Sequence, residues 1–421
     1  MKIALLFLFG AILGTVVNWA IYQLCYFGTR RISPFGPRDP KAKPRQLVDY
    51  VPILGWLFIR RDEGIHGRLF WVRPMLIELG LAVFTVWFYY WQLDGGLIAG
   101  RLPPRGGDAE LWFASHLLLI VLLTAATFID FDEQTIPDAI TIPGTLAGLG
   151  LAAFFPAFRL PEVVIGPNYE SIHFHSPESL AEMTWIHDWG GLAVGLFIIF
   201  GWAIALMPKI CTLRYGLFQG ARIMWASMIR PARKTVCKIR TQNRGPSALM
   251  YGFVVLGISV SAFYAWFWSV QGPGFESLLG SVLGMAFAGG LIWGVRLLAG
   301  LAMGQEAMGF GDVTLMVMVG AFLGWQATLP IFFYAPFAGV AVGAFQFLFT
   351  KNRAFPFGPY LAVATVYVVL RWPAVWEYML PYYAASMRYV LFSVIIGSLV
   401  LLPVLMLGMR ALRGPDPDED T

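Results

Sequence analysis

Long apolar runs separated by short polar connections occupy most of this chain. A helix that crosses the hydrocarbon core of a bilayer needs about 20 consecutive apolar residues. The apolar runs occupy residues 3–27, 75–93, 111–129, 139–156, 189–207, 248–270, 278–303, 313–326, 328–350, 358–371 and 386–409. This pattern predicts about eleven helices, of which the runs 313–326 and 358–371 are the shortest.

Composition supports a membrane location. Of the 421 residues, 58% are hydrophobic and 13% are charged, and the mean hydropathy is +0.66. Only helices and closed barrels satisfy their backbone groups in lipid, and the alternating ten-residue segments of a barrel are absent from the sequence. The first run, 3–27, is too long for a signal-peptide core and is expected to be retained. We therefore predict an all-α polytopic membrane protein with about 8–11 transmembrane helices and a cytoplasmic N-terminal loop.

The distribution of Lys and Arg predicts the topology. Residues 28–73 and 208–247 are rich in both, and 208–247 contains no acidic residue. The charged residues of the connection 157–188 are acidic except for Arg159. Cytoplasmic loops carry an excess of Lys and Arg, so both basic segments are expected inside and the acidic one outside. Counting helices from these anchors places Asp130 and Asp312 at the same, cytoplasmic, membrane face. For the basic segment 208–247, a simple topological anchor and a site for anionic lipid head groups are the two interpretations.

The first polar motif joins two apolar runs and reads Phe128-Ile-Asp-Phe-Asp-Glu-Gln-Thr-Ile-Pro-Asp138. Asp138 follows a proline and is suited to cap the next helix. Asp132 and Glu133 fit a solvated turn. Asp130 directly follows the apolar stretch, where a carboxylate is costly and marks a functional site.

The second motif is Gly309-Phe-Gly-Asp312, immediately before another apolar run. Glycines permit backbone angles and close approaches that other residues resist. Asp312 is suited either to cap the helix or to act as a catalytic carboxylate whose charge the helix N-terminus stabilises.

Two carboxylates that meet at one face suit the hydrolysis of a peptide bond. One, ionised, takes a proton from water, and the other, protonated, donates to the carbonyl oxygen or the leaving amine. Like charges a few ångströms apart do not both ionise easily, so such a pair holds one proton. Which aspartate is acid and which is base stays open.

Metal chemistry has little support in the sequence. Cys25, Cys211 and Cys237 form no CxxC pair, which argues against a zinc site. His173 and His175 form an HxH, for which a metal site and a solvated loop are the two interpretations.

Four ordered segments resemble the type IV prepilin peptidases, which are GxGD aspartyl peptidases. They are Ile129-Asp130 with Ile136-Pro-Asp138, Glu306-Ala-Met-Gly-Phe-Gly-Asp312 leading into Gly320-Ala-Phe-Leu-Gly-Trp-Gln326, Phe355-Pro-Phe-Gly-Pro-Tyr-Leu-Ala362, and an N-terminal set. The N-terminal set comprises Asn18, Tyr22, Val51-Pro-Ile-Leu-Gly-Trp-Leu57 and Arg73-Pro-Met-Leu-Ile-Glu78. The matches cover about residues 1–155 and 280–370.

The resemblance implies that Asp130 and Asp312 are catalytic and that Gly309 and Gly311 shape the turn that presents Asp312. It makes Asp132 and Asp138 turn or supporting residues. For Glu306, a supporting residue of the site and a polar loop residue are the two interpretations. The resemblance implies removal of a basic leader from a prepilin or pseudopilin at the bacterial inner membrane, and N-methylation from S-adenosylmethionine in many members. No nucleic-acid partner is expected. Many members carry two CxxC pairs in the cytoplasmic loop, and residues 28–73 contain no cysteine. The fold of this loop must then rest on other contacts, such as packing of Val51–Ile59 at the membrane interface.

The predicted organisation has five parts. They are residues 1–110 with the N-terminal helices and basic loop, 111–156 with the first aspartate, an insertion at 157–277, the GxGD helices at 278–409, and an acidic tail at 410–421. Two rival functions remain: a GxGD protease with substrates other than pilins, and an ion-coupled transporter. A transporter often shows repeated halves and helices broken near the midplane, and no repeat is visible.

Overall fold

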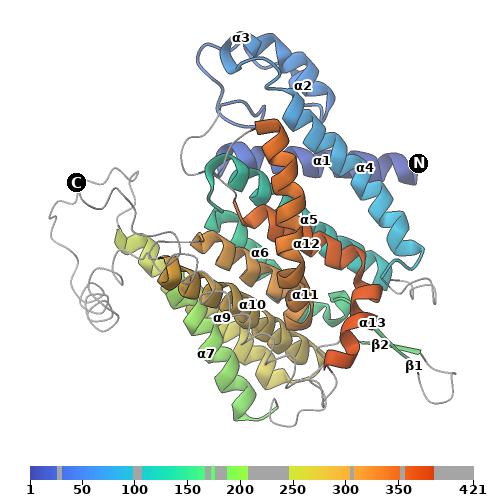
Figure 1. Cartoon of the computed structure of the whole chain (residues 1–421), viewed down its shortest axis with the longest axis vertical. Helices are drawn as coiled ribbons and strands as arrows, with labels where there is room; N and C mark the ends of the chain where they lie inside the picture. The colour runs from blue at the N-terminus through green and yellow to red at the C-terminus, as the bar shows by residue number, and fades with distance from the viewer. Residues whose placement is uncertain are drawn as a thin grey trace, which may run out of the picture.

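The computed structural model describes residues 1–25, 31–97, 107–165, 172–175, 187–206, 246–303, 308–350 and 356–383. These residues form a bundle of helices with one short hairpin (Figure 1). The long helices are α1 (Lys2–Gln23), α4 (Val72–Leu93), α5 (Asp108–Glu133), α6 (Asp138–Phe154), α7 (Trp189–Ala205), α9 (Pro246–Val270), α10 (Pro273–Met303), α11 (Phe310–Thr350), α12 (Gly358–Leu370) and α13 (Trp372–Tyr383). The all-α membrane fold predicted from the apolar runs is confirmed.

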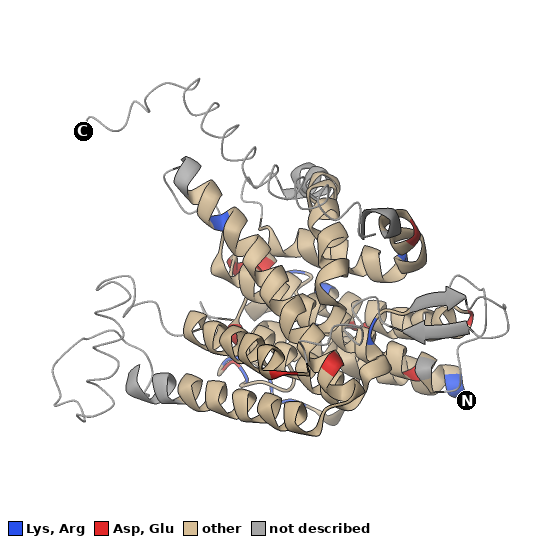
Figure 2. Cartoon of the chain, turned by 90° about the horizontal axis from the view of Figure 1, so that it is seen from below, with Lys and Arg blue, Asp and Glu red and all other residues tan. Residues whose placement is uncertain are grey.

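Six helices of the described residues are long and apolar enough to cross a membrane: α1, α4, α5, α9, α10 and α11. The pair α12 and α13, bent by 88°, raises this number to seven if it forms one span. The apolar helices α6 and α7 are shorter. Charged residues are sparse along the helices (Figure 2). The run 386–409 lies outside the described residues, so the total of about 8–11 spans stays a prediction.

Two hydrophobic cores hold the bundle together. The larger contains side chains from α1, α4, α5, α11 and α12. The smaller joins α7 and α9 to α6 and α10, with Tyr264 of α9 donating a hydrogen bond to the carbonyl of Gly191 at 2.8 Å. The helices of the predicted insertion therefore pack on the outer side of α6 and α10, away from α1 and α4.

Helix α11 folds back on itself at Gly324, whose φ of 82° interrupts the helical backbone. A straight helix from Asp312 to Gly339 would be about 40 Å long. Instead, both positions lie beside the first turn of α12: Asp312 next to Gly358, and Gly339 next to Tyr360. The two arms of α11 therefore correspond to the two apolar runs predicted at 313–326 and 328–350. The chain returns after Gly324 to the face on which Asp312 lies.

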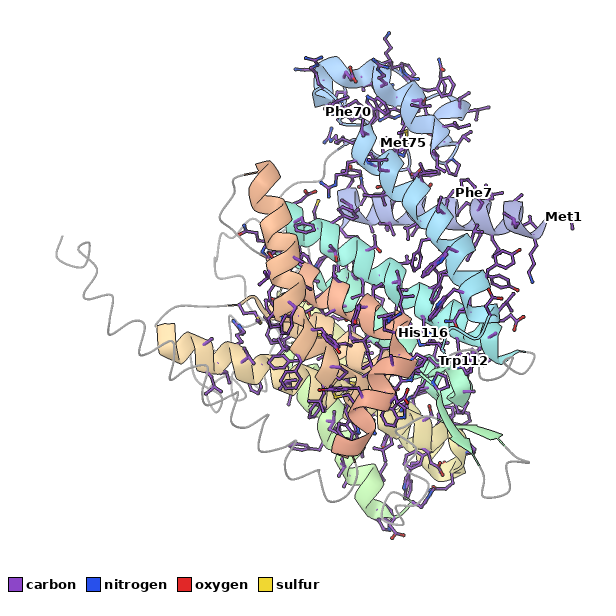
Figure 3. All side chains as sticks on the ribbon, turned by 45° about the vertical axis from the view of Figure 1, so that its right-hand side comes forward. Met1, Phe7, Phe70, Met75, Trp112 and His116 are labelled. Atoms are coloured by element: carbon purple, nitrogen blue, oxygen red, sulfur yellow. The ribbon has the colours of Figure 1, made fainter. Side chains whose placement is uncertain are left out.

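The N-terminal connection between α1 and α4 has a fold of its own. It contains the 3-10 turns η1 (Leu47–Tyr50) and η2 (Arg60–Asp62) and the short helices α2 (Leu54–Ile59) and α3 (Glu63–His66). We call this connection, whose described residues before α4 are 31–71, the excursion. Figure 3 shows it beside Phe70 and Met75, which lie where the chain enters α4. Two ion pairs with buried aspartates stabilise it, Arg61 with Asp49 at 2.5 Å and Arg45 with Asp62 at 3.3 Å, and a more exposed pair joins Arg60 to Glu63 at 3.7 Å. The hydrogen bond to Asp49 raises the pKa of Arg61, so the arginine keeps its charge.

Glu78 of α4 is the point at which the excursion meets the bundle. Its side chain is 1% exposed. Its Oε1 accepts hydrogen bonds from Trp56 Nε1 at 2.9 Å and Asn18 Nδ2 at 3.0 Å, and its Oε2 accepts one from the backbone N–H of Ile53 at 2.5 Å. A buried charge is stable only when such donors surround it. The single carboxylate thus connects α1, α2 and α4.

Besides the short elements between α1 and α4, three that follow α6 were not anticipated by the apolar pattern. Strands β1 (Glu162–Ile165) and β2 (Ile172–His175) pair antiparallel within the predicted outside connection. The 3-10 turn η3 (Pro156–Phe158) precedes them. His173 and His175 lie on β2, not in a loop, because the apolar-polar alternation of residues 172–175 suits a strand. The run predicted to end at residue 371 is followed directly by a further helix, α13. Pro373 lies in its first turn, where a proline is tolerated.

Candidate active site

Asp130 lies in the last turn of α5. The helix ends because Gln134 adopts a left-handed conformation with φ 55°, and its N–H donates to the carbonyl of Asp130 at 2.9 Å. A left-handed residue is a common helix terminator. The chain then needs only residues 134–137 to reach α6, as the short polar turn predicts. The Asp130 side chain is 4% exposed.

Asp312 lies in the first turn of α11, two residues after the helix begins at Phe310. Its side chain is 6% exposed. The preceding Gly311 packs directly on the turn that follows α5: a Cβ at Gly311 would lie 2.9 Å from Ile136 Cβ and 3.0 Å from Ile136 N. The absence of a side chain at Gly311 therefore brings the start of α11 against the end of α5.

Gly358, at the start of α12, lies between the two carboxylates. A Cβ on Gly358 would lie 2.5 Å from Asp130 Oδ2 and 3.2 Å from Asp312 Oδ1. The two oxygens are therefore separated by no more than the sum of these distances. The two carboxylates also interact electrostatically. The structure brings together the two aspartates that the sequence selects, at one end of the bundle.

Backbone donors surround the pair. The backbone N–H of Gly358 reaches the carboxylate of Asp130, and that of Gly309 reaches the carboxylate of Asp312. Both donors come from the starts of helices, where the positive end of the helix dipole favours a negative charge. The Oδ2 atom of Asp130 is buried without a hydrogen-bond partner in the described part of the chain. This arrangement leaves an acceptor free for water or substrate.

Arg73 holds the end of α5 from the side. Its Nη1 lies 2.7 Å from Asp132 Oδ1, its Nη2 donates to the carbonyl of Phe128 at 3.2 Å, and its guanidinium lies 4.9 Å from the centre of the Phe128 ring. Asp132 thus has a definite partner, beyond the solvated turn expected for it. These contacts bracket Asp130 on both sides and fix the last turn of α5.

Arg296 of α10 holds the second motif in a similar way. Its Nε donates to the carbonyl of Met308 at 2.9 Å, and its guanidinium lies 5.7 Å from the centre of the Phe310 ring. Its positive charge also acts on Asp312. Sequence reasoning assigned no role to Arg296, although an arginine inside an apolar run is itself a functional signal.

Gly358 and Tyr360 were also given no individual role. Both belong to the segment Phe355–Ala362, whose resemblance to a known family was the available signal. The Tyr360 side chain is 5% exposed, and its hydroxyl has no hydrogen-bond partner among the described residues. The phenol interacts electrostatically with Asp130.

Asp138 and Glu306 are the remaining predicted supporting residues. The expected N-cap role of Asp138 is wrong: Pro137 occupies the N-cap, and Asp138 is the first residue of α6. A proline at the N-cap leaves Asp138 inside the first turn, where an acidic side chain still suits the helix dipole. Asp312 likewise lies inside its helix, not at the cap. Glu306, the other supporting residue, lies outside the described residues.

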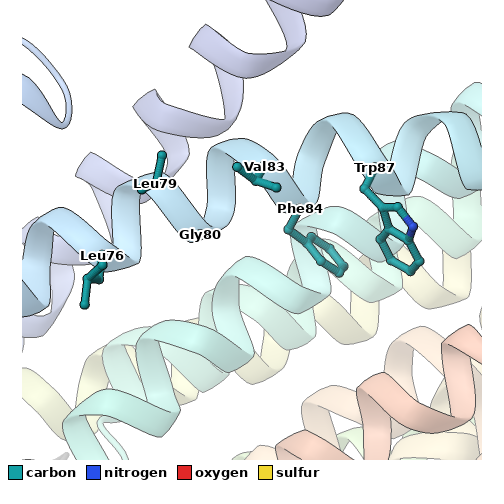
Figure 4. A pocket seen from close by; sticks show the side chains of 6 residues that line it. All are labelled: Leu76, Leu79, Gly80, Val83, Phe84 and Trp87. Atoms are coloured by element: carbon teal, nitrogen blue, oxygen red, sulfur yellow. The ribbon is translucent and has the colours of Figure 1, made fainter.

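No group of three or more His, Cys, Asp or Glu side chains suited to a metal ion occurs among the described residues. Cys211 and Cys237 lie outside them. A groove on α4 is lined by Leu76, Leu79, Gly80, Val83, Phe84 and Trp87 (Figure 4). Apart from the indole N–H of Trp87, its lining offers no polar group to the amino and carboxylate groups of S-adenosylmethionine. The groove therefore does not fit that cofactor and instead resembles a lipid-facing surface.

Comparison with known proteins adds independent observations. A family model described as "Type IV leader peptidase family" matches residues 117–168 and 246–344, which include both aspartates. A prepilin leader peptidase/N-methyltransferase of Aeromonas hydrophila is 38% identical over 88% of this chain and 90% of its own length. A protein of the same name from Aeromonas salmonicida is 22% identical over the same shares. One from Stutzerimonas stutzeri is 32% identical over 30% of this chain and 42% of its own length. No solved structure matches the chain.

Proposed function

The chain belongs to the type IV leader peptidase family, and from this premise we propose that Asp130 and Asp312 are its two catalytic carboxylates. Peptidase activity follows from the family. The observation that carries the assignment is the position of Gly358, which has one oxygen of each buried aspartate beside it. Two carboxylates at this separation can share a water molecule between them.

The chemistry follows from the environment of the pair. Two adjacent carboxylates with little exposure do not both ionise easily, so they share one proton. The ionised aspartate takes a proton from the attacking water, and the protonated one donates to the carbonyl oxygen of the scissile bond. The amides of Gly309 and Gly358 stabilise whichever carboxylate carries the charge.

The substrate proposed is a type IV prepilin or pseudopilin, in keeping with the names of the relatives. Its basic leader would remain in the cytoplasm and its apolar helix in the bilayer. The scissile bond would then lie at the membrane face. Asp130 ends one candidate span and Asp312 begins another, which suits cleavage at that level. The positive-inside pattern supports the cytoplasmic face.

N-methylation of the new N-terminus is the second activity in the names of the relatives. Because the α4 groove does not fit S-adenosylmethionine, we assign no residue and no step to it. Mass spectrometry of the processed N-terminus tests it directly: a methylated product supports the activity, and an unmethylated product from active enzyme removes it.

Substitution of each aspartate tests the peptidase mechanism. Asp130→Asn and Asp312→Asn are expected to abolish cleavage of a co-expressed prepilin, because an amide can neither accept nor donate the required proton. Asp94→Asn, at an exposed carboxylate that follows α4, is the matched control and should process fully. Immunoblots confirm equal membrane levels. Full processing by either variant of the pair would remove it from the mechanism.

The rival interpretations give different results in the same system. A GxGD protease with other substrates would need both aspartates but leave the prepilin intact. An ion-coupled transporter would leave the prepilin intact in every variant. Cleavage of the prepilin that depends on both aspartates excludes both rival functions.

A further inference from the structure

The excursion between α1 and α4 shows an unusual separation of charge. Within described residues 31–71 every exposed charged side chain is basic: Arg31, Arg38, Lys41, Lys43, Arg60 and Arg68. Of the four acids in these residues, two are buried, and Asp39 and Glu63 are partly exposed. Asp49 and Asp62 are 1% and 2% exposed and pair with Arg61 and Arg45. The exposed charges of the excursion are therefore mainly positive.

Apolar side chains lie exposed on the same excursion. In α2, Leu54, Leu57 and Phe58 are 54%, 46% and 48% exposed. Their i, i+3, i+4 spacing places them on one face of the helix. The opposite face is buried, with Trp56 at 2% and Ile59 at 0%. The preceding turn adds exposed Leu47, Val48 and Val51.

The depth of α2 is fixed by Glu78. Trp56 of α2 and Ile53 before it both donate to this carboxylate. Glu78 lies six residues inside α4, a rise of about 9 Å from the helix start. Asn18, which donates to the same carboxylate, lies five residues before the end of α1. Both helices are candidate spans. Helix α2 therefore lies at the level of the ends of two membrane helices, at the membrane surface.

We propose that α2 and the turn before it form an in-plane membrane anchor whose partner is an anionic lipid surface. Leu54, Leu57 and Phe58 enter the boundary between head groups and acyl chains. The basic residues of the excursion contact the anionic head groups. Exposed apolar residues on one helix face, in a segment whose exposed charges are mainly basic, are typical of interfacial helices, and basic residues next to a membrane helix bind anionic lipid.

The consequence concerns the aspartate pair. The anchor is attached through α4 to Arg73, whose side chain contacts the end of α5 at Asp132 and Phe128. Lipid contact at α2 therefore fixes the same helix end that carries Asp130. This proposal rests on the membrane fold and stands whether or not the aspartates are catalytic.

Spin labels in the full-length protein test the anchor. Cys25, Cys211 and Cys237 are replaced by Ser, and a single cysteine is introduced by Leu57→Cys, with Lys43→Cys as the control site on the same excursion. Each labelled protein is placed in nanodiscs at one copy per disc, with either phosphatidylcholine alone or phosphatidylcholine and phosphatidylglycerol. Collisions with oxygen report lipid, and collisions with a soluble nickel chelate report water.

The expected ratio of oxygen to nickel accessibility in anionic discs is about tenfold higher at position 57 than at position 43, because the interface excludes the chelate. Arg38→Gln with Arg68→Gln should reduce this difference in anionic discs only. Equal accessibility at the two positions in both lipids would overturn the anchor and leave the surface to a soluble protein partner. A ratio of oxygen to nickel accessibility at position 57 that is the same in both lipid compositions would overturn the proposal that the partner is anionic lipid.

Discussion

Replacing Gly358 by alanine would place a methyl group between the two aspartates. The backbone at Gly358 does not have positive φ, so alanine adopts it without strain. The effect must therefore arise from space alone. The added Cβ would lie 2.5 Å from Asp130 Oδ2, 2.7 Å from Ile136 Cδ1 and 3.2 Å from Asp312 Oδ1.

The expected loss follows from the displacement that this methyl group requires. Ordinary contact begins at 3.4 Å, so the carboxylate of Asp130 must move by about 1 Å. A misplacement of this size at a reacting group costs about 100-fold in rate, or about 2.7 kcal/mol of activation free energy. Substrate binding along the bilayer is unaffected. The loss should therefore appear in kcat with little change in KM.

The assay is cleavage of a purified prepilin by full-length enzyme in nanodiscs, with kcat and KM measured separately. Gly290→Ala in α10 is the matched control, because nothing lies within 4 Å of a Cβ at that position. Size-exclusion profiles and thermal melting confirm that both variants are folded. Gly358→Ala with the kcat of the unaltered enzyme would refute the geometry, since a methyl group cannot occupy that position while both carboxylates stay in place.

Two further substitutions test the residues that hold the aspartates in place. Gly311→Ala should lower kcat by about tenfold or more, because its Cβ would meet the backbone of Ile136. Gly309→Ala is the control and should be tolerated, since the nearest atom to its Cβ is Asp312 Oδ2 at 3.7 Å. Equal losses of kcat from both variants in the prepilin assay would contradict this prediction. Arg73→Ala should lower kcat by about tenfold with unchanged KM, because the end of α5 loses its partners, and Arg73→Lys should restore part of the rate. The exposed Arg371→Ala is the control for Arg73, and an unchanged kcat in Arg73→Ala would show that α5 holds Asp130 without it.

Much of the bundle could be predicted because the bilayer imposes a length on every span. Runs such as 75–93 and 248–270 coincide closely with α4 and α9. The fold-back at Gly324 was visible as two runs, although the apolar pattern cannot show how sharply the chain turns. The short hairpin and α2 were not predicted as elements, since four to six residues carry too little periodicity.

The choice of Asp130 over Asp132 and Asp138 agrees with where the structure places these residues. Asp130 interacts with Asp312, whereas helix geometry rotates Asp132 about 200° away, toward Arg73. Gly358 could not be identified in this way. Its role depends on α12 packing between two turns that are remote in sequence, and such proximity leaves no periodic signal. The residue type does not identify Gly358 either, because a glycine with open space around it would tolerate a side chain, as Gly290 does.

The location of Gly358 has a consequence for the order of synthesis. Asp130 emerges from the ribosome early, and Gly358 follows it by roughly 230 residues, a delay of about 10–50 s at ordinary elongation rates. The N-terminal excursion, with its Glu78 contacts, can assemble during that interval from segments that have already been made. The contacts of Gly358 with both aspartates can form only after α12 has been inserted. A nascent chain is therefore expected to lack the final arrangement of the aspartate pair, and with it the proposed activity, until α12 has been made.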